Sequence, residues 1–198
     1  IVKRTDNIDM PYNTDIIRPL DNPLDKKGGI AVLYGNLAPK GAVIKRSAAS
    51  ANLLNHRGKA KVFEDLEECQ KYLLDENSDM TKDTVIVLRG FGPVGAPGMP
   101  ENGNYMPLPP KLNKEGIKDF VRITDSRMSG GCFGTQVLHV APESAVGGPL
   151  AIVKDGDIIH LDVDSNLIEL EISDAEFNER MKNVKKKTHP DITRGFLK

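Results

Sequence analysis

The stretch ITDSRMSGGCFGTQVLHVAPESAVGGP, from Ile123 to Pro149, contains a change from strand to glycine-rich loop around which the rest of the chain is arranged. Its first residues close an apolar run, Phe120–Thr124, that is typical of a buried strand. The turn from Asp125 to Gly131 follows, where paired glycines permit positive φ and let backbone N–H groups approach a ligand. The stretch indicates a binding site, although such residues also occur in tight loops whose Asp and Ser bind local backbone donors.

Short β-rich runs recur before and after this stretch, separated by glycine, proline and Asp-Gly signals. They are Ile30–Tyr34, Ala42–Lys45, Lys59–Phe63, Val85–Leu88, Phe120–Thr124, Ala151–Val153, Ile158–Val163 and Leu167–Ile172. Such spacing predicts a sheet-rich barrel or sandwich. The last two runs, joined by Asp164-Ser165-Asn166, form the best hairpin candidate, with apolar and acidic residues alternating in the second run.

Two segments predict helices. Glu64–Leu74 has apolar residues at helical spacing and acidic residues in its first turn, so we interpret Cys69 within it as a core thiol. Asp174–Lys187 follows a Ser173 capping box and ends in a lysine run, which we interpret as a solvated helix end rather than a binding patch.

Composition narrows the classes of partner. The 198 residues include 27 basic and 28 acidic side chains, a formal net charge of −1, so nothing favours a nucleic-acid or anionic-membrane surface. No apolar run approaches the ~20 residues of a membrane span. Cys69 and Cys132 have no CxxC or His spacing around them, which argues against a disulfide framework or a self-contained metal site and favours a reducing compartment. A small molecule or a protein surface is the expected partner.

The first residues have a different character. Residues 1–29 are polar and broken by prolines and glycines, which indicates an extended N-terminal segment or interdomain linker. Residues 30–198 then form the expected folded domain. Because the sequence begins at Ile1 rather than Met, we expect an excised domain or a processed product.

A second glycine-rich loop, Arg89–Glu101, follows the run Val85–Leu88. Its glycines and prolines make it both permissive and stiff, and it ends on a carboxylate that could bind a hard cation such as Mg²⁺. A phosphate cradle is the competing interpretation, but the loop has neither the Walker lysine nor a helix-opening GxGxxG. A third loop, Gly35–Lys45, leaves the first run in the same way, so three loops could converge at one mouth of a barrel.

Five motifs in this order resemble the C-terminal domain of the dihydroxy-acid and sugar-acid (aldonate) dehydratases. They are GNLAPKGAVIK at Gly35–Lys45, GPVGAPGMPE at Gly92–Glu101, TDSRMSGG at Thr124–Gly131, HVAPESAVGGPLA at His139–Ala151 and DGDIIHLDV at Asp155–Val163. RMSGG followed by FGTQVLHVAPE is more similar to the aldonate members than to the branched-chain members. The resemblance implies a β-rich α+β fold, a closed or nearly closed β-barrel of about eight strands flanked by helices.

The resemblance also implies a reaction. The family dehydrates a 2,3-dihydroxy acid to a 2-keto acid, with an iron–sulfur cluster as Lewis acid toward the C3 hydroxyl and Mg²⁺ at the carboxylate end. Ser129 is then the catalytic base for the C2 proton, acting as an alkoxide stabilised by positive charge. Glu101 is a Mg²⁺ ligand, and Ser126, Arg127 and Gly130 bind substrate.

The same resemblance predicts what the chain lacks. The iron–sulfur ligands belong to an N-terminal domain outside it, so this domain is the expected partner and the isolated chain is expected to be inactive. Cys132 matches no ligand position, and Gly131 stands where aldonate dehydratases commonly have a threonine. A homo-oligomer in the cytoplasm, acting on a small hydroxy acid, is also expected.

Some alternatives stay open. An Arg127 salt bridge to Asp125 is as plausible as a contact to substrate, and His139 is better explained as a hydrogen-bonded structural residue than as an acid–base group. A dihydroxy-acid dehydratase of branched-chain amino-acid synthesis, or a non-catalytic ligand-binding module, remains an alternative to the aldonate dehydratase.

Overall fold

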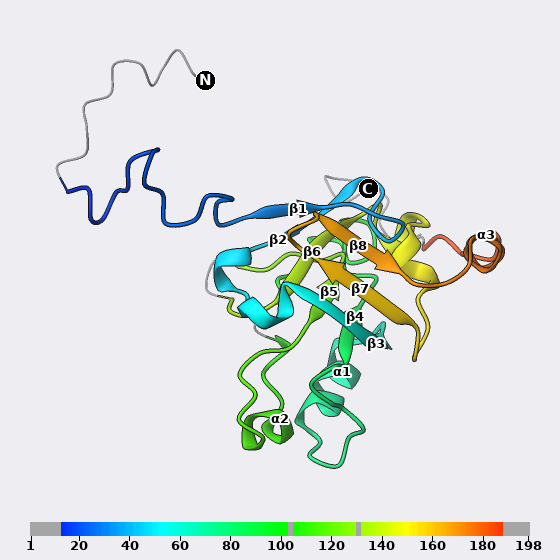
Figure 1. The fold of residues 1–198 in the computed structure, drawn as a ribbon. Helices are drawn as coiled ribbons and strands as arrows, with labels where there is room; N and C mark the ends of the chain where they lie inside the picture. The colour runs from blue at the N-terminus through cyan, green and yellow to red at the C-terminus, as the bar shows by residue number, and fades with distance from the viewer. Residues whose placement is uncertain (1–12, 103–104, 130–131, 188–198) are drawn as a thin grey trace.

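One mixed eight-stranded sheet dominates the computed structural model, which describes residues 13–102, 105–129 and 132–187. The strands are β1 (Ala31–Leu33), β2 (Gly41–Ile44), β3 (Asn55–Phe63), β4 (Val85–Leu88), β5 (Arg122–Thr124), β6 (Gln136–Ala141), β7 (Ile158–Asp162) and β8 (Leu167–Leu170). Their order is β1-β2-β6-β5-β4-β3-β7-β8. The helices are α1 (Leu66–Leu74), α2 (Pro110–Lys114) and α3 (Asp174–Lys182), with short 3₁₀ turns η2 (Arg46–Ala48), η3 (Ala51–Leu53), η5 (Ser144–Val146) and η6 (Pro149–Ile152). The predicted β-rich α+β, nearly closed barrel is confirmed (Figure 1).

The two outer strands of the sheet meet and nearly close the barrel. Tyr34, directly after β1, forms a parallel bridge with Leu167 at the start of β8. Its N–H donates to the Asn166 carbonyl at 2.8 Å, and its carbonyl accepts from the Ile168 N–H at 2.8 Å. The backbone groups at this part of the sheet edge are therefore paired within the chain rather than exposed to other chains.

Asn36 continues this closure with its side chain. Its amide group donates to the Leu170 carbonyl at 2.9 Å and accepts from the Leu170 N–H at 2.7 Å, as a further strand residue would. The close approach requires glycine at position 35, where a Cβ would lie 2.0 Å from the Ile168 carbonyl oxygen. The third predicted loop therefore serves barrel closure at its start.

The four central strands β3, β4, β5 and β6 run parallel, whereas the outer pairs are antiparallel. The carboxyl ends of adjacent parallel strands lie at the same edge of a sheet, where ligands commonly bind in α/β folds. The loop 89–101 leaves the end of β4, and the loop that begins at Asp125 leaves the end of β5. This topology brings the two glycine-rich loops together.

Two apolar clusters lie on opposite faces of β4. Val85 and Val87 belong to the larger cluster, which fills the barrel, and Ile86 and Leu88 belong to the smaller one. The smaller cluster also contains Cys69, Leu73 and Leu112 from α1 and α2. Figure 1 shows these two helices together at one end of the molecule. The continuous apolar sequence of β4 is thus explained by burial on both faces.

Helix α1 confirms the first helix prediction with slightly later bounds. Asp65 is its N-cap and accepts a hydrogen bond from the Glu68 N–H at 3.0 Å. Cys69 is fully buried, as predicted, and burial raises the pKa of its thiol to about 12. This thiol stays protonated at neutral pH.

Helix α3 begins as predicted but ends five residues early. The Ser173 side chain caps it by accepting from the Glu176 N–H at 3.2 Å. Its last residue is Lys182 rather than Lys187. Lys187 instead donates from its backbone to Ala145 and from Nζ to the Gly95 carbonyl, each at 2.8 Å. The lysine run therefore crosses the barrel surface beyond the helix, and its prediction as a helix end was wrong.

One strand prediction was wrong and one strand was missed. The apolar run Ala151–Val153 lies at η6 and its C-cap, because Pro149 begins a 3₁₀ turn instead of a ladder. The missing strand is β6, which contains a bulge: Gly41 pairs with Ala141 but Val43 pairs with Leu138. His139 occupies the bulge with φ of 50°, so the alternation expected of a strand is broken there.

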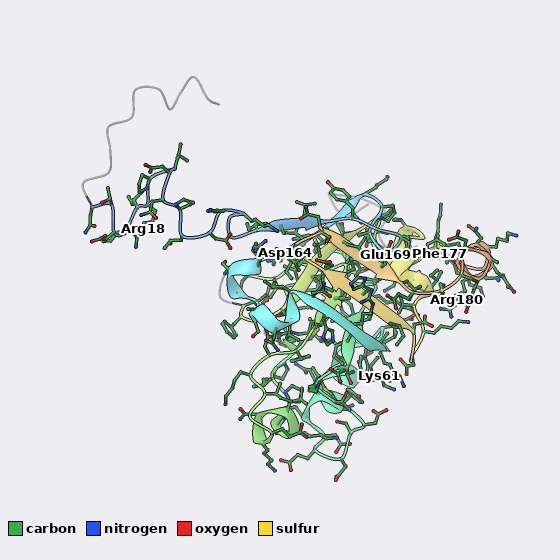
Figure 2. The ribbon with its side chains drawn as sticks, in the orientation of Figure 1. Arg18, Lys61, Asp164, Glu169, Phe177 and Arg180 are labelled. Atoms are coloured by element: carbon green, nitrogen blue, oxygen red, sulfur yellow. The ribbon has the colours of Figure 1, made fainter. Side chains whose placement is uncertain are left out.

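The described start of the chain, residues 13–30, forms no helix or strand and extends away from the barrel (Figure 1). Figure 2 shows Arg18 in this segment far from Arg180 on α3. The segment meets the barrel at Lys27, whose Nζ lies 2.7 Å from Asp164 Oδ1. Its role as an interdomain linker stays a prediction.

No helix within the described ranges is long and apolar enough to cross a bilayer.

Candidate active site

The loop after β4 is held by the carboxylate that follows β5. Asp125 is 1% exposed and accepts from the backbone N–H groups of Gly90, Phe91 and Ser144 at 2.9 to 3.1 Å. The Ser144 hydroxyl is a further donor to the same carboxylate. Asp125 therefore joins the ends of β4 and β5 to the turn η5, and Arg127 donates from Nε to the Met99 carbonyl rather than to Asp125.

A second carboxylate holds the middle of the same loop. Glu143 is buried and accepts from the Val94 N–H at 2.8 Å and the Gly95 N–H at 3.0 Å. The loop approaches so closely that a Cβ on Gly92 would lie 2.2 Å from Glu143 Oε2. The GPVG sequence is thus explained by the contact between loop backbone and carboxylate.

We expect Asp125→Ala to destabilise the fold by about 3 kcal/mol or more, because it leaves several buried donors unsatisfied at about 1–3 kcal/mol each. Urea unfolding of the variant should show the loss as a lower midpoint. Asp164→Ala is the matched control, since Asp164 is exposed and its removal should barely move the midpoint. Equal midpoints for the two variants would show that Asp125 does not hold the loop.

The end of the loop 89–101 runs alongside the start of the loop that follows β5. Ser126 is fully buried and its hydroxyl donates to the Pro100 carbonyl at 3.0 Å. Arg127 is exposed and its Nε donates to the Met99 carbonyl at 2.8 Å. The backbones of Glu101 and Arg127 form a parallel bridge. These contacts fix Glu101 beside the residues that follow Arg127.

Glu101, Ser129 and Cys132 consequently form one cluster, which we call the acid–serine–thiol cluster. Glu101 Oε1 lies 3.4 Å from the Ser129 backbone nitrogen and 3.1 Å from Cys132 Sγ. Ser129 Oγ lies 3.9 Å from Cys132 Sγ. Ser129 is exposed, Glu101 is half-buried and Cys132 is buried. The Ser129 hydroxyl is therefore accessible next to a carboxylate that solvent reaches only in part.

Cys132 contributes a protonated thiol to this cluster. Burial raises its pKa, and the hydrogen bond that it donates to Glu101 raises it further. A thiol held protonated is a weak nucleophile. Its place between Glu101 and Ser129 favours a role in shaping the cluster.

The predicted substrate-binding residues differ in how accessible their side chains are. The Ser126 hydroxyl is turned toward backbone carbonyls, whereas Arg127 is exposed near the cluster. Gly130, the third substrate-binding prediction, lies outside the described residues. His139 is exposed and occupies the β6 bulge with φ of 50°, and its interpretation as a structural histidine stays a prediction.

Sequence reasoning missed the contacts of three polar groups in and around the two loops. Glu143 lies far away along the chain, and Asp125 was expected to bind Arg127. Asn102 is 1% exposed, and neither atom of its amide has a partner among the described residues. The position of Asn102 directly after the PGMPE motif was the one feature of the sequence that could have pointed to it.

Two neighbouring residues, Glu101 and Asn102, offer oxygen ligands of the kind that a Mg²⁺ site needs. The Glu101 carboxylate and the adjacent unpartnered Asn102 amide oxygen are the hard oxygen groups that Mg²⁺ prefers. The described residues contain no group of three or more His, Cys, Asp or Glu side chains placed to hold a metal ion. They therefore do not fit an iron–sulfur cluster, and a Mg²⁺ site would need ligands beyond those described.

A cavity of about 790 Å³ lies elsewhere, near η6 and α3. Both arginines of its lining are ion-paired: Arg89 lies 2.7 Å from Glu64, and Arg180 lies 2.5 Å from Glu176. Figure 2 shows Arg180 on α3 at the edge of the molecule. The acid–serine–thiol cluster, not this ion-paired hollow, remains the candidate site.

Comparison with known proteins supports the resemblance of the motifs. The profile of the family "Dihydroxy-acid/6-phosphogluconate dehydratase C-terminal" matches residues 15–198. The chain belongs to this family. An L-arabonate dehydratase of Azospirillum brasilense is 52% identical over 91% of this chain, and a 6-deoxy-6-sulfo-D-gluconate dehydratase of Pseudomonas putida is 52% identical over 85%. A dihydroxy-acid dehydratase of Acetivibrio thermocellus is 43% identical over 92%.

The chain spans 30% to 32% of the length of these dehydratases. The family match begins at residue 15, within the segment that we interpret as a linker. Membership of the dehydratase family confirms the resemblance predicted from the five motifs. Both sugar-acid and dihydroxy-acid dehydratases are among the relatives.

Proposed function

We propose that this chain is the C-terminal domain of a hydro-lyase that dehydrates a 2,3-dihydroxy carboxylic acid, preferably a sugar acid, to a 2-keto-3-deoxy acid. The observation that supports the proposal is the convergence of two separate motifs, which brings Glu101 Oε1 to 3.4 Å from the Ser129 backbone nitrogen. Family membership and relatives named as aldonate dehydratases support the reaction class.

In this proposal Ser129 removes the C2 proton and Glu101 binds Mg²⁺. The proton passes from C2 to the ionised Ser129 oxygen, and the C3–O bond breaks so that hydroxide leaves and takes up a proton to become water. The resulting enol gains a proton at C3 and loses the proton of its C2 hydroxyl, which gives the 2-keto acid. When bound, the iron–sulfur cluster supplies a Lewis acid toward that hydroxyl and Mg²⁺ supplies positive charge near the carboxylate end. Arg127, exposed beside the cluster of side chains, attracts the substrate carboxylate.

The charge of Glu101 makes the two roles dependent on each other. A carboxylate so close to Ser129 opposes a negative charge on the serine oxygen. Glu101 would hold the cation, whose positive charge would offset this opposition and favour ionisation of the serine oxygen. In this proposal Ser129 therefore acts as the base only when Glu101 binds a cation.

The ligands of the iron–sulfur cluster would then come from the N-terminal part of the relatives' length, which this chain does not span. The chain's nearest partner is then its own N-terminal domain, and the whole protein acts as a homo-oligomer. Both cysteines are free thiols, which favours a reducing compartment such as the cytoplasm.

Anaerobic assay of the full-length protein tests the function. Turnover of a panel of aldonates and branched-chain dihydroxy acids should be followed by 2-keto acid formation. We expect the highest kcat/KM with an aldonate. Preference for a branched-chain acid would favour the alternative dehydratase, and failure with every acid at full cofactor content would favour a non-catalytic binding module.

We expect Glu101→Gln in the full-length protein to weaken Mg²⁺ binding and lower the rate together, by about tenfold or more. The substitution keeps the shape but removes a negative charge from the cation. Mg²⁺ titration by calorimetry and by rate measures both effects. Glu179→Gln, on the exposed face of α3, is the control and should change neither. Unaltered Mg²⁺ affinity in the Glu101 variant would make Glu101 a surface residue.

A further inference from the structure

Exposed apolar side chains are concentrated in one stretch near the start of the described chain. Seven of the twelve large apolar residues that are exposed in the described ranges lie between residues 16 and 34. We call these seven the apolar strip: Ile16, Ile17, Leu20, Leu24, Ile30, Val32 and Tyr34. Single exposed apolar residues are normal on a protein surface, whereas a group of neighbouring ones marks an interaction site.

The apolar strip runs from the segment 13–30 onto the outer face of β1. Leu20 lies in that segment, which extends away from the barrel, and its side chain is fully exposed (Figure 1). At β1, Val32 and Tyr34 flank the fully buried Leu33, so they point to the outside of the barrel. The strip therefore forms one side of an apolar contact whose other side the described residues do not supply.

The segment 13–30 is held at its base and restricted along its length. Asp25 Oδ2 lies 3.4 Å from Arg46 Nε, and the Arg46 side chain is itself mostly buried. Pro19 and Pro23 fix φ at two positions among the exposed leucines. A segment that is restricted before it binds loses less conformational entropy when a partner covers it. The segment is thus suited to docking, not only to spacing two domains apart.

The charges of the same segment favour a protein partner. A surface that binds nucleic acid or an anionic membrane would be basic. The segment instead has no net charge, because its acidic and basic residues are equal in number: Asp15, Asp21 and Asp25 against Arg18, Lys26 and Lys27. An apolar protein surface therefore fits the strip.

The base of the segment lies close to the candidate active site, because the turn η2 contacts both. The Ser47 N–H donates to the Gly29 carbonyl at 3.2 Å. The Ala48 carbonyl accepts from the Gly134 N–H at 3.1 Å. Gly134 follows Cys132 of the acid–serine–thiol cluster by two residues. A domain that docks on the strip near its base therefore lies beside this cluster.

The relatives indicate which domain this would be. This chain spans 31% of the length of the Azospirillum brasilense dehydratase and belongs to a family of C-terminal domains. The family profile begins at residue 15, so it includes the whole apolar strip. An N-terminal domain joined to this segment would meet the strip at a high effective concentration, because the two belong to one polypeptide.

We propose that the apolar strip is the surface on which the N-terminal domain of the same polypeptide docks, and that docking there brings this domain to the acid–serine–thiol cluster. The inference rests on the part of the proposed function that makes this chain the C-terminal domain of a longer enzyme. It extends that function by naming the surface through which the two domains meet. Burial of the strip between them stabilises the contact, because its side chains leave water.

Photochemical cross-linking of the full-length protein tests the docking without requiring turnover. Leu20 is replaced by p-benzoylphenylalanine, and the products are separated on a denaturing gel and mapped by mass spectrometry. We expect a product of monomer mass in which residue 20 is joined to a peptide of the folded N-terminal domain. A product of dimer mass, joined to a second copy, or no product at all would overturn the proposal. The same replacement at Leu74, which is exposed on α1, is the control and should form no such link.

Leu20→Asp combined with Leu24→Asp should release the segment in the full-length protein. Hydrogen exchange of the amides of residues 13–30 should become at least about tenfold faster, because docking would then bury two carboxylates in place of two leucines. Leu74→Asp is the matched control and should leave this exchange unchanged. Unchanged exchange in the double variant would overturn the proposal, and the cross-linking result decides it if that variant does not fold. Cross-linking to the N-terminal domain in a protein that dehydrates no acid would instead overturn the proposed reaction and leave this inference standing.

Discussion

The isolated chain should fold but form no detectable 2-keto acid from any aldonate. The barrel interior and the smaller cluster under α1 and α2 provide two buried cores, and the sheet edge at Tyr34 and Asn36 is paired within the chain. We therefore expect folding to need no further partner. Under the proposed mechanism, however, Ser129 and Glu101 supply only the base and one cation ligand.

Circular dichroism and a 2-keto acid assay on one preparation test this expectation. The chain should melt cooperatively, and the full-length protein assayed under the same anaerobic conditions is the positive control. Adding the separately purified N-terminal domain, loaded with its cofactors, should restore part of the activity. Aldonate turnover by the chain alone would refute the division of labour between the two domains.

The strands that could be predicted from sequence are those with uninterrupted apolar patterns. Val85–Leu88 is buried on both faces, so its hydrophobicity was sufficient. β6 was missed because the bulge at His139 breaks the alternation within its six residues. The strand prediction for Ala151–Val153 was wrong because a run of three apolar residues is too short to distinguish a strand from a 3₁₀ turn.

The candidate site was predictable to the extent that its residues lie in local motifs. The roles of Glu101 and Ser129 were predicted from the resemblance to the dehydratases, which rests on local motifs, and they stay predictions. Adjacent parallel strands bring the segments that contain the two residues together. The carboxylates that hold the loops were not predictable, since Glu143 contacts Gly95 across 48 residues of sequence. Asp125 was assigned the nearest charged partner, Arg127, whereas buried backbone donors bind it instead.

Ser129→Ala in the full-length protein should lower kcat by about a hundredfold or more, the lower end expected of a positioned general base. KM should change little, because the hydroxyl acts on the C2 proton during the reaction and not in initial binding. The melting temperature should also change little. Ser129 is exposed, and among the described residues its hydroxyl lies 3.9 Å from Cys132 Sγ, too far to stabilise the loop appreciably.

Ser173→Ala separates this effect from the ordinary consequence of losing a serine hydroxyl. Ser173 caps α3 through the Glu176 N–H, so its removal should cost about 1 kcal/mol of stability and leave turnover intact. A catalytic serine and a structural serine therefore give opposite patterns of kcat and melting temperature. Both variants should be measured at equal iron–sulfur content, because loss of the cluster would imitate loss of the base. If Ser129→Ala keeps near-normal kcat under these conditions, another group must remove the C2 proton, and the exposed position of Ser129 would have no catalytic explanation.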